Sequence, residues 1–125
     1  MTAPATPDVP SAPDRVERPW GWYESVFSTD GHQIKRIGVH PGRQISLQLH
    51  HRRAEHWVVV RGEAWVTLGE RAFALAVGGH VDIPVGAVHR LANRTDGPLE
   101  IVEVQFGDYL GEDDIVRLQD DFGRA

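Results

Sequence analysis

The chain has 125 residues, of which 41% are hydrophobic and 25% are charged, and its formal net charge is −5. This length allows one domain with a single core, and the composition is ordinary for a water-soluble globular protein. The negative net charge argues against a general nucleic-acid-binding surface. Because the chain has no cysteine, it forms no disulfide and no thiolate-bound zinc site. No run approaches the roughly 18 apolar residues of a membrane span, and the N-terminus lacks a signal-peptide layout, so we expect a cytoplasmic protein without a membrane partner.

The N-terminal segment is rich in proline. Residues 1–17 hold four of the eight prolines and almost no large side chain that a core needs. Such a composition predicts a disordered tail, and we therefore place one folded domain at residues 18–125.

The rest of the chain reads as short strands between turns. Glycine-containing turn signals such as Asp30-Gly31, Pro41-Gly42 and Gly78-Gly79 separate them. The predicted strands are Trp22–Phe27, Gln33–Val39, Gln44–His50, His56–Arg61, Ala64–Leu68, Arg71–Ala76, His80–Ile83, Val88–Arg94 and Leu99–Phe106. Many short strands at near-regular spacing predict an all-β sandwich or barrel. Only residues 111–118 depart from the strand pattern. Acidic residues come first in this segment and a cation comes late, which favours a short C-terminal helix.

The stretch from Gly42 to Gly62 carries a candidate metal site. Gln48 and His50 are two residues apart, so on a strand their side chains point to the same face. Glu55 follows after a basic step at which the chain can turn back. Two neutral ligands and one carboxylate suit a divalent metal that keeps positions open for a ligand. The alternative is a surface strand that is merely rich in histidine and arginine.

A second cluster has the pattern Gly78-x5-Pro84-x-Gly86-x2-His89-x3-Asn93. Together with Gly42-x5-Gln48-x-His50-x4-Glu55-x6-Gly62, it resembles the two motifs of the cupin family, whose fold is a small jelly-roll barrel, or double-stranded β-helix, with a metal in its mouth. The resemblance implies Gln48, His50, Glu55 and His89 as metal ligands. Gln48 stands where many cupins have a histidine.

The resemblance extends over residues 18–124. Segments such as Arg18-Pro-Trp-Gly-Trp-Tyr, Arg53-Ala-Glu-His-Trp-Val-Val-Val and Ile83-Pro-Val-Gly-Ala-Val-His-Arg-Leu are similar to the C-terminal domain of type II mannose-6-phosphate isomerases. This implies zinc as the bound metal, with cobalt, manganese, nickel or iron as alternatives. In that family the domain usually follows a mannose-1-phosphate guanylyltransferase domain. Here we expect a detached domain, with a separate guanylyltransferase as a possible partner.

The same resemblance implies an aldose–ketose isomerase for mannose 6-phosphate and fructose 6-phosphate. Such a reaction needs an acid/base group and a cationic site for the phosphate. Arg53 is the first candidate for binding and catalysis, against the alternative of an ordinary ion pair, and Lys35 and Arg90 are further phosphate ligands. Arg90 points away from the metal if it alternates strictly with His89. Glu103 is the candidate base, with Lys35 as a second choice, and a purely structural hydrogen bond is the alternative role for Glu103.

Three functions follow from these residues. The first is the metal-dependent isomerase. The second is a non-catalytic module that binds sugar phosphates or nucleotide sugars in the synthesis of polysaccharide precursors. The third, which the glutamine in the ligand set disfavours, is a cupin oxygenase. We also expect a homodimer formed by extension of a sheet edge.

Overall fold

The computed structural model describes residues 15–124, and every regular element among them is a β-strand. In chain order the strands are β1 (Val16–Arg18), β2 (Gly21–Thr29), β3 (His32–Val39), β4 (Leu47–Leu49), β5 (Arg53–Arg61), β6 (Ala64–Leu68), β7 (Arg71–Leu75), β8 (His80–Ile83), β9 (His89–Ala92), β10 (Leu99–Gly107) and β11 (Val116–Gln119). The all-β prediction is confirmed. The described part of the chain has no helix of the length and apolar character that a membrane crossing requires.

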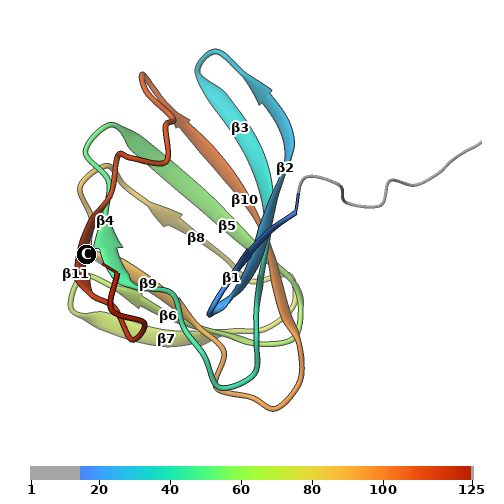
Figure 1. Cartoon of the computed structure of the whole chain (residues 1–125). Coiled ribbons are helices and arrows are strands. Elements are labelled where there is room, and N and C mark those ends of the chain that lie inside the picture. The colour runs from blue at the N-terminus through green and yellow to red at the C-terminus, as the bar shows by residue number, and fades with distance from the viewer. Residues whose placement is uncertain (1–14, 125) are drawn as a thin grey trace, which may run out of the picture.

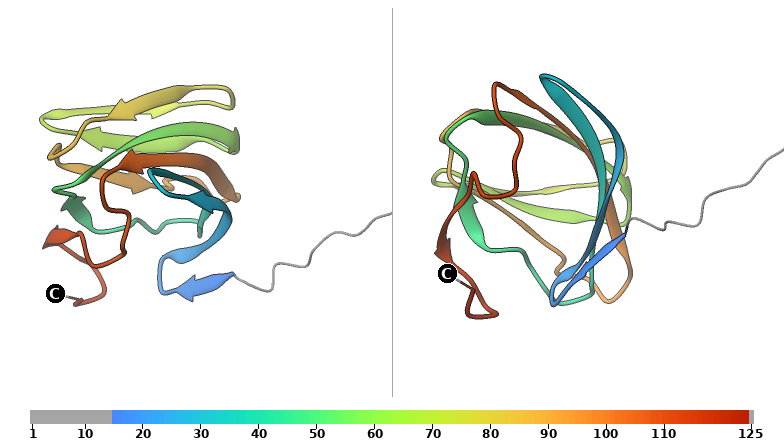
Figure 2. Two further views of the ribbon diagram at one scale, coloured as in Figure 1. Left: turned by 90° about the horizontal axis from the view of Figure 1, so that it is seen from above. Right: turned by 45° about the horizontal axis from the view of Figure 1, so that its top comes forward.

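Two antiparallel sheets face each other (Figure 1). The six-stranded sheet has the order β1-β2-β3-β10-β5-β8, and the five-stranded sheet has the order β11-β4-β9-β6-β7. Strands that are neighbours in space are often distant in sequence, as β3 and β10 are. Figure 2 shows the strands of the two sheets arranged around a common interior. Buried side chains from both sheets pack there. This is the jelly-roll arrangement of a double-stranded β-helix.

Side chains alternate between core and surface along the central strands. In β5 the buried positions are Arg53, Glu55, Trp57 and Val59, and each intervening residue is less buried. This alternation follows from the two-residue repeat of a strand. The apolar core between the sheets consists of Trp20, Val39, Trp57, Val59, Ala64, Val66, Ile83, Leu91, Leu99 and Ile101.

Glycine residues shape two of the turns, the one between β5 and β6 and the one before β9. Gly62 has a φ of 79°, and a Cβ on it would lie 2.2 Å from the Pro98 carbonyl oxygen, so the β5–β6 turn needs glycine for both reasons. Gly86 has a φ of 82°, and its N–H donates to the His50 carbonyl at 2.8 Å. The turn before β9 is therefore tied to the residue that follows β4, and the tight bend itself agrees with the Pro84-x-Gly86 pattern.

The predicted C-terminal helix is wrong. Residues 112–113 form a turn, and Val116–Gln119 form β11, which pairs with β4. The acidic residue Asp114 does not stabilise a helix terminus. It stabilises the turn between β4 and β5. The Asp114 carboxylate accepts the backbone N–H groups of His51 and Arg52, both at 2.9 Å.

The predicted tail is only partly within the structure. Residues 1–14 lie outside the described residues. Val16 and Glu17, which the composition places in the tail, belong to β1 and pair with Tyr23 and Trp22 of β2. The first strand therefore begins two residues before the predicted domain start at Arg18.

Candidate metal centre

Three neighbouring strands of the six-stranded sheet change from apolar to polar along their inner faces. On β10 the buried positions run from Leu99 and Ile101 to Glu103 and Gln105. The register aligns Glu103 with Lys35 of β3, so the polar positions meet at one end of the barrel. The apolar inner-face residues pack in the hydrophobic core, and the polar inner-face residues form the candidate functional site.

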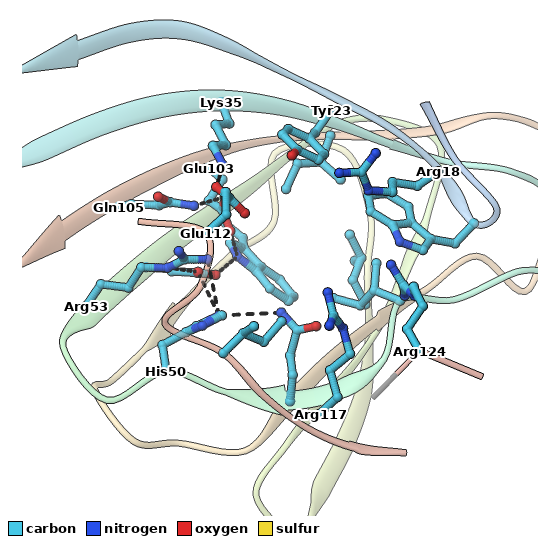
Figure 3. A pocket seen from close by; sticks show the side chains of 18 residues that line it. Arg18, Tyr23, Lys35, His50, Arg53, Glu103, Gln105, Glu112, Arg117 and Arg124 are labelled. Atoms are coloured by element: carbon cyan, nitrogen blue, oxygen red, sulfur yellow. Dashed lines mark hydrogen bonds and ion pairs between the residues drawn. The ribbon is translucent and has the colours of Figure 1, made fainter. Parts of the chain in front are cut away.

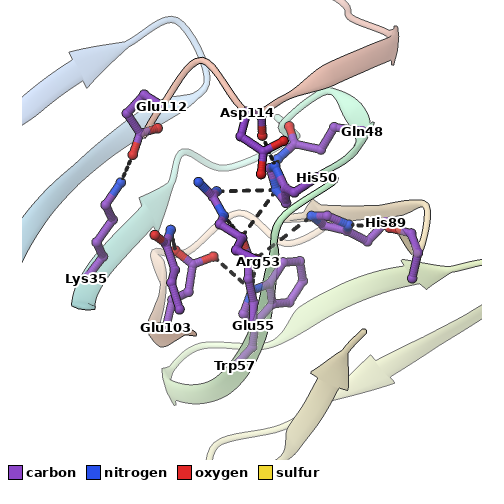
Figure 4. Close-up of polar contacts among 12 residues, drawn as sticks. Lys35, Gln48, His50, Arg53, Glu55, Trp57, His89, Glu103, Glu112 and Asp114 are labelled. Atoms are coloured by element: carbon purple, nitrogen blue, oxygen red, sulfur yellow. Dashed lines mark hydrogen bonds and ion pairs between the residues drawn. The ribbon is translucent and has the colours of Figure 1, made fainter. Parts of the chain in front are cut away.

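His50, Glu55 and His89 come together at this polar end (Figure 4). Each offers one ligand atom, and these atoms lie within 4.8 Å of one another. His50 Nε2 lies 3.2 Å from Glu55 Oε2, and His89 Nε2 lies 3.9 Å from Glu55 Oε1. All three side chains are buried. The structure thus brings together three of the four predicted ligands as a compact set of donors suited to a divalent ion.

Both imidazoles present an unprotonated nitrogen to the centre. His50 Nδ1 lies 2.7 Å from the Asp114 carbonyl oxygen, and His89 Nδ1 lies 2.9 Å from the Ala87 carbonyl oxygen. Since a carbonyl only accepts, Nδ1 carries the proton in each ring and Nε2 keeps its lone pair. Among the described residues His89 Nε2 is buried without a hydrogen-bond partner. A metal ion would satisfy this atom, so the residues present fit a bound metal.

Gln48 lies beside this group, on the strand opposite His89. Gln48 and His89 are directly paired in the β4–β9 ladder. The Gln48 Nε2 lies 3.4 Å from His50 Nε2, and its Oε1 accepts from Ser46 Oγ at 2.5 Å. Rotating the amide by 180° would direct the carbonyl oxygen at the centre, and Ser46 Oγ can equally accept from the amide nitrogen. Gln48 is thus placed to be the fourth ligand.

Arg53 is buried against the ligand atoms. Its Nε donates to Glu55 Oε2 at 2.9 Å, and its Nη2 lies 3.3 Å from His50 Nε2. Burial opposes the charge of Arg53, but the charges of Glu55, Glu103 and Glu112 raise its pKa above the ordinary value. The guanidinium is therefore a permanent cation at the metal end of the pocket, and not an exposed surface arginine.

Two buried carboxyl groups share a tryptophan donor. Trp57 Nε1 donates to Glu55 Oε1 at 2.9 Å and to Glu103 Oε2 at 3.1 Å. Burial alone would raise the pKa of Glu55, but a hydrogen bond with the Glu103 side chain and the charge of Arg53 hold that pKa well below its usual range. Burial and the neighbouring Glu55 charge raise the pKa of Glu103 well above its usual value. Neighbouring charges and burial thus shift the pKa values of these two carboxyl groups in opposite directions.

Lys35 and Glu103 face the same pocket, whereas Arg90 does not line it. The buried Lys35 ammonium pairs with the exposed Glu112 carboxylate and lies 4.6 Å from the Tyr23 ring centroid. The Arg90 guanidinium instead donates to the Ile45 carbonyl at 2.9 Å and to Gln119 Oε1 at 2.8 Å. Strand alternation after His89 turns Arg90 toward β11, where it anchors the C-terminal strand.

The pocket contains groups that the sequence did not single out. Its volume is about 130 Å³. Besides the residues above, its lining includes Arg18 of β1, Arg117 of β11 and Arg124 near the C-terminus. Figure 3 shows these three arginines on one side of the pocket, and His50, Arg53, Glu103 and Lys35 on the other. No sequence spacing links the two ends of the chain, although Arg18 and Arg117 stand within segments that carry the family resemblance.

The antiparallel two-sheet barrel and the buried His–Glu–His group together define a double-stranded β-helix protein of the cupin type. Residues 9–120 match the family model described as "Mannose-6-phosphate isomerase C-terminal", and the chain belongs to this family.

Curated relatives agree with this assignment. The chain is 54% identical over 111 residues to the xanthan biosynthesis protein XanB of Xanthomonas campestris pv. campestris, covering 89% of this chain and 24% of XanB. It is 55% identical over 110 residues to the alginate biosynthesis protein AlgA of Pseudomonas aeruginosa, covering 88% and 23%. The mannose-1-phosphate guanylyltransferase ManC of Salmonella typhimurium is 49% identical, again covering 88% and 23%. The chain therefore spans about a quarter of the length of these relatives.

Solved structures show the same fold. A double-stranded β-helix protein of Klebsiella pneumoniae superposes with a TM-score of 0.67 at 23% identity, covering 87% of this chain and 88% of that one. Bacillus subtilis oxalate decarboxylase, described by its Mn(II) centres, superposes with a TM-score of 0.73 at 22% identity, covering 84% and 30%. At this identity the likeness concerns the fold.

Proposed function

We propose that the chain is a metal-dependent isomerase of the mannose-6-phosphate isomerase type, which interconverts mannose 6-phosphate and fructose 6-phosphate. The observation that carries this proposal is the buried His89 Nε2 without a partner among the described residues, which converges with His50 and Glu55 on a pocket lined by cations and carboxyl groups. Family membership supplies the sugar phosphate as substrate class.

The residues that would hold the metal are His50, Glu55 and His89, with Gln48 as the fourth ligand. Two imidazoles, a carboxylate and an amide oxygen suit zinc, and cobalt, manganese, nickel or iron are alternatives. When bound, the metal would act as a Lewis acid for the negative charge that develops on the sugar oxygens.

Glu103, Lys35 and Arg53 are positioned for the remaining tasks. Isomerisation moves a proton between C1 and C2, so it needs a group that can both give and accept a proton. Glu103 lines the pocket, and its raised pKa favours the protonated form, so this carboxyl group can hold a proton that it exchanges with a substrate. Lys35 is the second candidate for this role. Arg53 would stabilise negative charge on the sugar oxygens, because its guanidinium lies against the ligand atoms.

An isomerase assay on the purified chain tests this proposal. With zinc, cobalt or manganese added, the chain should convert mannose 6-phosphate to fructose 6-phosphate. Arg53→Ala should lower kcat by about 100-fold, as expected for loss of a charge-stabilising donor, while metal content stays unchanged. Loss of metal together with activity in Arg53→Ala would contradict the role given to Arg53.

The second candidate is a non-catalytic module that binds a sugar phosphate or nucleotide sugar beside a separate guanylyltransferase. It is favoured by one observation, that the matched relatives are about four times longer than this chain and that one of them is named a guanylyltransferase. Absence of turnover with every metal, while sugar phosphate still raises the melting temperature, would select this alternative.

A further inference from the structure

Two histidines and an aspartate meet on the outer face of the six-stranded sheet. The antiparallel pairing of β5 with β8 sets His56 opposite Asp82 and Val58 opposite His80. Residues that are opposite or diagonal across such a pair have side chains on the same face of the sheet. His56 follows Glu55 in β5, so strand alternation directs it to the face opposite the candidate metal centre. The group is therefore separate from the pocket inside the barrel.

The Asp82 carboxylate fixes the orientation of the His56 ring. His56 Nδ1 lies 2.5 Å from Asp82 Oδ1. Because a carboxylate only accepts, Nδ1 of the neutral ring carries the proton and Nε2 keeps its lone pair. Metal-binding histidines commonly have this arrangement, in which one ring nitrogen donates to a carboxylate and the other binds the ion.

The His80 ring lies at a distance from His56 that suits a shared ion. The two ring centroids are 5.3 Å apart, and the ring planes are tilted by 41°. Two imidazoles that bind one tetrahedral ion through bonds of about 2.0–2.1 Å have their centroids about 5 Å apart. In the described part of the chain the His80 side chain has no hydrogen bond, so its ring nitrogens are open to a ligand.

All three side chains are accessible to an ion in solution. His80 is exposed, and the side chains of Asp82 and His56 are 80% and 33% exposed. Side chains on a solvent-facing surface can adjust their torsion angles to an ion without displacing core residues. The Asp82 carboxylate also attracts a cation to this face. Access and charge thus agree with the spacing of the two rings.

We propose that His56 and His80 bind a second divalent ion, from the late first-row transition metals, while Asp82 orients His56. Two imidazole nitrogens favour zinc, copper or nickel over magnesium and calcium, which prefer oxygen ligands. Only two protein side chains bind the ion directly, so this site should be weaker than the buried candidate metal centre. The inference concerns the outer face of the barrel and does not depend on the proposed isomerase function.

Calorimetric titration of the full chain with zinc tests the inference. The chain is first incubated with zinc and gel filtered, so that a tight site is already filled, and zinc is then added in a buffer that does not bind metals. The unaltered chain should take up one further zinc ion. His80→Asn should lose this uptake. Asp82→Ala should weaken it by about 10- to 100-fold, the effect of removing a carboxylate that orients a metal-bound histidine.

The matched control is His32→Asn/His40→Asn, which removes two exposed histidines from other parts of the surface. It should take up the further zinc ion as the unaltered chain does. No further uptake by the unaltered chain, undiminished uptake by His80→Asn, or an equal loss in the control would overturn the inference. Isomerase turnover has no part in these outcomes, so its absence would overturn only the proposed function.

Discussion

Each candidate histidine ligand is oriented by a backbone carbonyl. The Asp114 and Ala87 carbonyls accept from His50 and His89, and both partners lie in turns whose positions other contacts fix. The Ala87 N–H donates to the Pro84 carbonyl at 3.1 Å, which closes the turn. Local backbone geometry therefore sets which nitrogen of each ring faces the candidate metal centre.

Gln48→Ala should weaken zinc binding by at least about tenfold, because the site loses its fourth ligand while the three others remain. Competition with a chromophoric chelator measures this affinity. Gln44→Ala is the matched control, since Gln44 bonds to Asp121 and does not line the pocket. Equal affinity in Gln48→Ala and the unaltered chain would show that Gln48 is not a ligand.

Asn93, the last residue of the second motif, has a structural role. Its buried Nδ2 donates to the Val39 and Gly97 carbonyls at 2.9 and 2.8 Å, and its Oδ1 accepts from Thr95. Asn93→Ala should lower the free energy of unfolding by about 2–4 kcal/mol, because buried partners lose their bonds. Urea denaturation measures the loss, and zinc affinity of the folded variant should be unchanged. A loss of less than about 1 kcal/mol would contradict this role.

At the residue scale the sequence predicts the candidate metal ligands, but it does not predict all of the arginines that line the pocket. His50 and Glu55 lie close together in the chain, so strand alternation and one turn are enough to place them. Arg18 of β1 and Arg124, which follows β11, line one pocket because the edge strands of two different sheets lie near each other there, and no local sequence pattern encodes this. Arg90 has the same chemistry as these residues but is turned toward β11.

The strands are the elements that the sequence predicts best. Each of the nine predicted strands overlaps an observed one, because alternation and glycine turns are local signals. Two extents differ most: β5 begins at Arg53 and not at the predicted His56, and residues 44–50 were expected as one strand. Only Leu47–Leu49 form it, and Gln44 makes a single bridge to Ala92.

The C-terminal segment shows why a local helix signal fails. Its acidic residues lie where a helix dipole would favour them, yet Asp114 caps the chain at residues 51–52 and β4 offers unpaired backbone groups. Pairing with β4 and the Arg90 bonds to Gln119 outweigh the weak preference for a short isolated helix.

The turn after β11 should loosen in acid. Hydrogen bonds from Arg124 lower the pKa of Asp120 to about 2. A carboxyl group with a depressed pKa stabilises the fold above its unfolded pKa of about 4, and this contribution disappears as the pH falls toward 2. The difference in melting temperature between the unaltered chain and Asp120→Asn should therefore be largest above about pH 5 and vanish near pH 2. A difference that does not vary with pH would contradict the assignment.

The whole molecule divides into an apolar end and a polar end. The same strands, β3, β5 and β10, carry core residues at one end and Lys35, Glu55 and Glu103 at the other. The core therefore provides the rigid support from which the site residues project, and burial of the site follows from the closure of the barrel around it.

Sheet extension to a homodimer remains a prediction at this scale. The open sheet edges are β1 and β8 in one sheet and β7 and β11 in the other. Light scattering coupled to size exclusion should give twice the chain mass. Replacing the central residue of the edge strand that pairs with the second copy by proline should restore the monomer mass. A monomer at all concentrations would exclude the dimer.

The central claim is that His50, Glu55 and His89 hold one divalent metal. Elemental analysis of the chain after dialysis against zinc and gel filtration tests it most directly, with His89→Ala and Glu55→Gln measured alongside. We predict about one zinc per chain in the unaltered protein and a large loss in both variants, because each removes a ligand from a three- or four-ligand site. Zinc at background level in the unaltered chain, or at equal levels in all three proteins, would contradict the account.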